Sequence, residues 1–172
     1  MTPRPRVYLA GPDAFRPDAE AHFQALAQEC DALGMEALIP VECAIGTGTG
    51  PKRATRIYDG NMELLRRAGG VIANLQPFRG LEPDSGTVFE VGVAVTLGLP
   101  VVAYGLPQGT YADRVTAAMT TRRDGSGVLR DADSASVEDF GLPLNLMLSC
   151  SVVLEPCAEA ALAKLAIVLV RR

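Results

Sequence analysis

The amino-acid sequence predicts an α/β fold, in which helices cover both faces of a mainly parallel sheet of five strands. Short apolar runs alternate with longer segments of helical periodicity along most of the 172 residues, a pattern typical of strands that are buried on both faces. The composition agrees, because 48% of the residues are hydrophobic and a chain of this length can bury a proper core. We find no internal repeat and no linker, and we expect residues 1–172 to form a single domain.

The first half of the chain supplies three of the predicted strands, at residues 6–10 (RVYLA), 35–40 (MEALIP) and 70–75 (GVIANL). A helix is predicted over residues 18–34, where apolar side chains share one face and Gly34 ends the helix. A second helix is predicted over residues 57–69. The segment 44–56 is rich in glycine and threonine, which predicts a mobile loop near a site.

The second half continues the alternation less regularly. Strands are predicted at residues 100–105 and 151–155, and helices at residues 87–98, 111–119, 142–149 and 157–170. The pattern is weakest over residues 106–141, where the stretch 122–136 is predicted to be a surface loop. Five strands interleaved with helices indicate a flavodoxin-like or Rossmann-like three-layer sandwich, because crossovers between parallel strands are almost always right-handed.

Charge and composition exclude several classes of partner. The net charge is −4 and the pI is near 5.0, so no basic stripe is available for a nucleic acid polymer. No run of 18 apolar residues occurs and the N-terminal apolar run is too short for a signal peptide, so we expect a cytoplasmic protein without a membrane partner. Four cysteines without C-x-x-C spacing and one histidine suggest neither a zinc site nor a disulfide framework. We expect no metal and no cofactor.

Candidate chemistry lies where the predicted strands end. Ligands of such sheets bind beyond the carboxyl ends of the strands, where Tyr8, Gly11, Asn74 and the loop 76–86 would converge. The next stretch, PDSGTVFEVG, adds Asp84 and Glu90.

A helix beginning near Gly86 or Thr87 would place Glu90 in its first turns. The helix dipole favours an ionised carboxylate there by roughly 0.3–1 kcal/mol, which suits a nucleophile or base, and Asp84 would then exchange a proton with a leaving group. The spacing is equally consistent with Asp84 as a simple helix cap and Glu90 as a stabilising acid.

Three blocks of sequence resemble a known family. VYLAGPDAF, NMELLRRAGGVIANLQPFRGLEPDSGTVFEVG and LPLNLML are similar, in this order, to the nucleoside 2-deoxyribosyltransferases. The resemblance implies a flavodoxin-like enzyme of nucleotide salvage that moves 2-deoxyribose between nucleobases through a covalent sugar–enzyme ester. It implies that Glu90 is the nucleophile, that Tyr8 hydrogen-bonds and orients it, and that Asp84 exchanges protons with the base.

The resemblance also implies a homo-oligomer with shared sites. Asn145 matches a residue that reaches the sugar from a neighbouring subunit, with Met147 beside it. An amide in so apolar a stretch has few reasons to lie inside one subunit, because a buried amide without partners costs on the order of 1–3 kcal/mol.

The expected partners are 2-deoxyribonucleosides and free nucleobases. Asn74 is a candidate to hydrogen-bond the ligand, and Phe15 and Phe78 are candidates to stack on the base or to lie in the core. At Asn61 this chain carries an amide where some members carry an acid, with Asp59 two residues before.

Two other functions stay open from the sequence. The first is a nucleoside or deoxynucleoside 5′-monophosphate N-glycosidase, in which water replaces the acceptor base. SGTVFE also matches the G-T-x-x-E fragment of phosphoribohydrolases, although Asp84-Ser85 replaces their preceding glycine pair. The second is a non-catalytic nucleotide-binding module.

Overall fold

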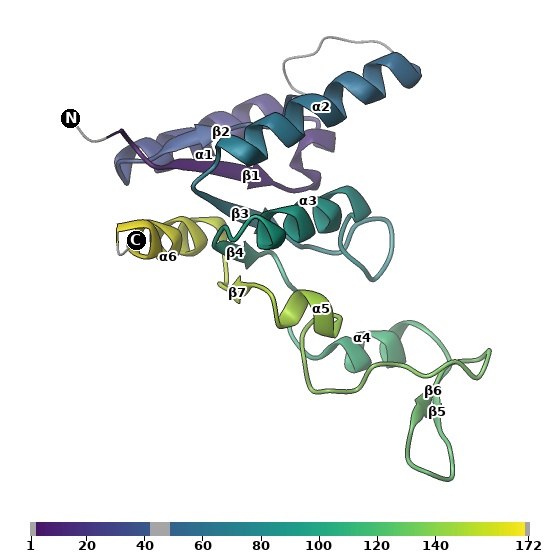
Figure 1. Ribbon diagram of the computed structural model, residues 1–172. Helices are drawn as coiled ribbons and strands as arrows, with labels where there is room; N and C mark the ends of the chain where they lie inside the picture. The colour runs from purple at the N-terminus through teal and green to yellow at the C-terminus, as the bar shows by residue number, and fades with distance from the viewer. Residues whose placement is uncertain (1–2, 42–48, 171–172) are drawn as a thin grey trace.

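A computed structural model describes residues 3–41 and 49–170 of the chain. Its centre is a five-stranded sheet (Figure 1) made of β1 (Arg6–Ala10), β2 (Glu36–Leu38), β3 (Gly70–Asn74), β4 (Val101–Tyr104) and β7 (Val153–Leu154). The strand order is β2-β1-β3-β4-β7, and all four pairings are parallel. The predicted fold class is therefore confirmed. The order reverses between β1 and β3, which is where sheets of this topology bind ligands.

Helices cover the two faces of this sheet in pairs. One face packs against α1 (Ala19–Ala32) and α6 (Ala158–Val170), and the other against α2 (Pro51–Arg67) and α3 (Ser85–Thr96). Strand β1 serves both layers, because Val7 and Leu9 point to the α1 and α6 side while Tyr8 and Ala10 point to the α2 and α3 side. This alternation follows from the two-residue repeat of a strand, and it aims the Tyr8 phenol at α3.

Helix α2 begins earlier than the sequence predicts. It starts at Pro51 after Gly50, whose φ is +106°, so residues 51–56 are helical and the loop predicted there is wrong. Proline is favoured at the first position of a helix, where its missing N–H costs nothing, and this start signal outweighs the glycine and threonine content of the stretch. The remainder of that loop prediction, at residues 44–48, lies outside the described residues.

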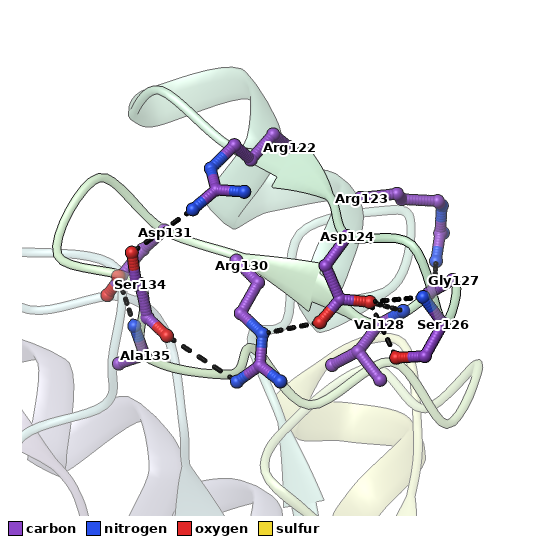
Figure 2. A network of polar contacts seen from close by, with 10 residues as sticks. All are labelled: Arg122, Arg123, Asp124, Ser126, Gly127, Val128, Arg130, Asp131, Ser134 and Ala135. Carbon is purple, nitrogen blue, oxygen red and sulfur yellow. Dashed lines mark hydrogen bonds and ion pairs between the residues drawn. The ribbon is translucent and has the colours of Figure 1, made fainter.

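The predicted surface loop at 122–136 contains a small antiparallel hairpin of β5 (Arg122–Arg123) and β6 (Leu129–Arg130). It follows α4 (Tyr111–Ala118) and lies away from the main sheet (Figure 1). Figure 2 shows its polar network, in which Asp124 accepts hydrogen bonds from Ser126, Val128 and Arg130. The Ser126 hydroxyl, followed by Arg130, holds the pKa of Asp124 well below its usual range. Hydrogen bonds to the Asp124 carboxylate thus hold this turn together.

Within the described residues, no helix is both long and apolar enough to cross a membrane.

Candidate active site

Glu90 projects from the buried side of α3. It shares a helix face with Thr87 and Ala94, which are 2% and 0% exposed, because residues three and four apart lie on one side of a helix. Glu90 is itself half-buried. The helix begins at Ser85, and its first turn contains no acid. The helix dipole acts mainly within the first turn, so it contributes less to Glu90 than the sequence analysis expected.

Side chains from two other elements hold the Glu90 carboxylate. The Tyr8 hydroxyl donates to Glu90 Oε1 at 2.6 Å, and Asn61 Nδ2 on α2 donates to the same oxygen at 3.3 Å. Tyr8 is fully buried, and a buried phenol needs a hydrogen-bond partner. The short O···O distance is typical of a hydroxyl that donates to a carboxylate. Hydrogen bonds from Tyr8 and Asn61 therefore orient the Glu90 carboxylate.

Asn61 is itself positioned by the backbone. Its Oδ1 accepts a hydrogen bond from the Val41 N–H at 3.0 Å, which leaves Nδ2 to face Glu90. An acid at this position has no N–H to donate to Glu90. Asp59 is exposed. Of these two residues, the structure brings Asn61 to the carboxylate.

Asp84 caps α3. Its Oδ2 accepts from the Thr87 N–H at 2.9 Å and from the Thr87 hydroxyl at 3.0 Å, as an N-cap residue does. The capping interpretation, left open by the sequence, is thus correct for the fold. The cap also holds the Asp84 carboxylate at the N-terminus of the helix that carries Glu90. Both cap hydrogen bonds use Oδ2, and Oδ1 takes no part in them.

Asn74 and Gly11 lie at the switch point of the sheet, beside a buried carboxylate that the sequence analysis missed. Asn74 Nδ2 donates to both oxygens of Asp13, at 3.1 and 3.0 Å, and its Oδ1 accepts from the Gln76 N–H. A Cβ on Gly11 would lie 2.7 Å from Asp13 Oδ2, so only glycine fits there. The sequence signal was available, because Asp13 follows the end of a buried strand.

His22 is another neighbour of Asp13. His22 lies on α1, and its Nε2 is 3.3 Å from Asp13 Oδ1. That nitrogen is buried and makes no hydrogen bond to any residue in the described ranges.

Phe15 and Phe78 stack on each other. Phe15 belongs to the 3-10 helix η1 (Pro12–Phe15) after β1, and Phe78 to the loop after β3. Their ring centroids are 5.3 Å apart with an interplanar angle of 23°. The Arg79 guanidinium lies 4.6 Å from the Phe78 ring and 5.5 Å from the Phe15 ring, within cation–π range of both. Phe15 is 61% exposed, so it is not a core residue.

Asn145 and Met147 lie on a different surface from Glu90. They line a groove of about 640 Å³ between α3 and α5 (Leu146–Ser149), whose α3 side is formed by Val88, Val91, Gly92 and Val95. Asn145 has partners within its own chain, contrary to the expectation from the sequence. Its Oδ1 caps α5 by accepting from the Met147 N–H, and its Nδ2 donates to Glu138 Oε1 at 3.1 Å.

The fold is a flavodoxin-like α/β sandwich in which Tyr8 of β1 and Asn61 of α2 converge on the Glu90 carboxylate of α3. Residues 7–147 match the family model described as nucleoside 2-deoxyribosyltransferase, and the chain belongs to this family. The family consists of enzymes that act on nucleosides.

Known proteins agree with this assignment. A solved structure of a 2-desoxiribosyltransferase from Leishmania mexicana is 32% identical and superposes with a TM-score of 0.76, covering 96% of this chain and 98% of the other. An uncharacterized protein from Schizosaccharomyces pombe is 30% identical over 83% of this chain and 74% of its own length. A conserved protein from Enterococcus faecalis is 20% identical, with a TM-score of 0.59 over 95% and 98% of the two chains, and it shows the fold alone.

Proposed function

We propose that the protein transfers 2-deoxyribose between nucleobases through a covalent ester on Glu90. The observation that carries the proposal is the convergence of Tyr8 and Asn61 on Glu90 Oε1, because a nucleophile must be held at a fixed angle to the carbon it attacks. A Glu90 oxygen attacks C1′ as the C1′–N bond to the leaving base breaks. A nitrogen of the incoming base then attacks C1′, and the Glu90 carboxylate is released.

Asp84 is proposed to balance the proton. It gives a proton to the leaving base and takes one back from the incoming base, so the enzyme returns to its starting state. The cap on Oδ2 supports this role, since it holds the group in one orientation while Oδ1 handles the proton.

The proposed substrates are 2-deoxyribonucleosides and free nucleobases. Loss of the base develops oxocarbenium character at C1′, and the electron-withdrawing 2′-hydroxyl of a ribonucleoside opposes that charge. We therefore expect ribonucleosides to react more slowly. Nucleosides are also expected to react faster than 5′-monophosphates, because no cluster of basic residues adjoins the sequence blocks of the site, although Arg79 lies over the Phe15 and Phe78 rings. Deoxynucleoside 5′-monophosphates should therefore be tested as substrates beside the nucleosides.

The active unit is proposed to be a homo-oligomer with shared sites. Within one chain Asn145 and Met147 line the α3–α5 groove, and Met147 is 72% exposed. An apolar groove edged by an exposed methionine is typical of a surface that a partner covers. A second copy seated there would carry Asn145 toward the neighbouring site.

The deciding experiment incubates the protein with deoxyinosine, with and without free adenine, and identifies the products. Deoxyadenosine would support transfer. Deoxyribose in both reactions would indicate an N-glycosidase, and an unchanged donor would indicate a binding module. Glu90→Ala should lower transfer at least about a thousandfold with the fold intact, since covalent catalysis is lost. Activity within tenfold of the parent would rule Glu90 out as the nucleophile.

A further inference from the structure

We infer that Asp13 is a positioning residue for the acceptor base: paired with Asn74, it sets the Phe15–Phe78 stack on which the base lies. The inference rests on the proposed function for its substrate class. The buried polar pair Asp13–Asn74 and the stacked aromatic pair Phe15–Phe78 join the same two segments of chain.

The polar pair is buried and specific. Asp13 is 2% exposed and Asn74 is 5% exposed, and the Asn74 amide spans both carboxylate oxygens. Burying a carboxylate is costly unless hydrogen bonds compensate it, and a pair of apolar residues would fill the space more cheaply. The surrounding backbone is shaped to the pair. A side chain on Gly11 would collide with Asp13 and Asn74, and one on Gly105, whose φ is +85°, would collide with Asn74.

The pair acts on two short segments that lead to the rings. Asp13 lies two residues before Phe15 within η1, so its hydrogen bonds with Asn74 attach that turn to the end of β3. Asn74 Oδ1 accepts from the Gln76 N–H at 3.2 Å, which directs the loop toward Phe78. The segments at the carboxyl ends of β1 and β3 are thus joined by two contacts, the buried Asp13–Asn74 pair and the stacked Phe15 and Phe78 rings.

The spacing of the rings determines how a base would bind. A base held between two rings needs about 7 Å, or two contacts of about 3.5 Å each, whereas the centroids are 5.3 Å apart. The base therefore stacks on an outer face of the pair. The platform is correctly placed only if η1 and the loop after β3 keep their separation, which Asp13 and Asn74 set.

The test measures adenine binding by equilibrium dialysis in a Glu90→Gln background, so it does not depend on transfer. We expect Asp13→Asn to weaken binding tenfold or more, and the exchanged variant Asp13→Asn/Asn74→Asp to recover to within threefold of the background protein. Asp133→Asn, an exposed aspartate on the hairpin segment, is the matched control. In the active protein, Asp13→Asn should raise the KM for the acceptor base far more than it lowers kcat.

A double-mutant cycle links the polar pair to the rings. Phe15→Ala removes an exposed ring and should also weaken adenine binding tenfold or more. If Asp13 acts through Phe15, the effect of Asp13→Asn should shrink to threefold or less in the Phe15→Ala background. Additive effects, unchanged binding in either single variant, or failure of both the single and the exchanged Asp13 variants to fold would overturn the inference. A parent protein that binds adenine but transfers nothing would refute the proposed function alone.

Discussion

Tyr8 and Glu90, separated by 82 residues in the sequence, are joined by a 2.6 Å hydrogen bond between β1 and α3. The Tyr8 hydroxyl is the donor and the Glu90 carboxylate is the acceptor, so the phenol orients the carboxylate oxygen that it contacts. The bond exists because Tyr8 is on the face of β1 that packs against α3, and because Glu90 is on the inner face of that helix.

Removing the Tyr8 hydroxyl should slow the reaction without unfolding the protein. Tyr8→Phe keeps the ring volume and removes the hydroxyl that donates to Glu90 Oε1, while the Asn61 amide that donates to the same oxygen stays. A hydrogen bond to a charged group contributes roughly 1.5–3 kcal/mol, so we expect kcat to fall about 10- to 150-fold. Tyr104→Phe, at another buried strand tyrosine in the opposite core layer, should stay within threefold. Equal losses in both variants would contradict the assignment.

Two substitutions separate the roles of Asp84. Asparagine is also a good N-cap, so Asp84→Asn should retain the stability of the parent. It should lose about a hundredfold or more on natural purine donors and much less on donors with an activated leaving group. Asp84→Ala should lose the same activity and about 1 kcal/mol of stability. Thermal unfolding and initial rates check both effects, and uniform loss on all donors would indicate a structural role.

Shared sites can be tested by mixing subunits. Glu90→Ala and Asn145→Ala proteins should each be inactive, and exchange of subunits should restore part of the activity, since some interfaces then combine an intact Glu90 with an intact Asn145. Asn145 also caps α5 and binds Glu138, so its replacement can change the local fold. Circular dichroism of Asn145→Ala is therefore the necessary control. No recovery despite demonstrated exchange of folded subunits would show that each site belongs to one chain.

The hairpin turn should depend on one carboxylate. Asp124→Ala removes the acceptor for the Ser126 and Val128 N–H groups and for Arg130, so the Val128 amide should exchange faster with solvent while transfer stays within twofold. The pKa of Asp124 is lowered by folding. Its contribution is therefore present above the usual aspartate pKa and is lost as the pH falls through the lowered value. Hydrogen exchange between pH 5 and 7 should show constant protection of Val128 in the parent; a decline within that window would be inconsistent with this account.

Much of the fold could be predicted because its signals are local. Each central strand is a continuous apolar run, and the confirmed parallel sheet follows from strands alternating with helices. The start of α2 was misplaced by six residues, since Pro51 outweighed a composition typical of loops. The hairpin at 122–130 was missed because polar contacts around Asp124 specify it, with little hydrophobic periodicity to reveal it.

The sequence by itself determined the α/β class, the family resemblance, and the candidate residues Tyr8, Asp84 and Glu90. Only the tertiary structure decided which groups meet. Asp13 and Asn74 are 61 residues apart and are brought together by the register that pairs Ala10 with Ala73. Asn145 hydrogen-bonds Glu138 of its own chain. Hydrophobic patterns specify which face of an element is buried, whereas hydrogen bonds between distant polar side chains depend on distances that exist only after the strands and helices have packed.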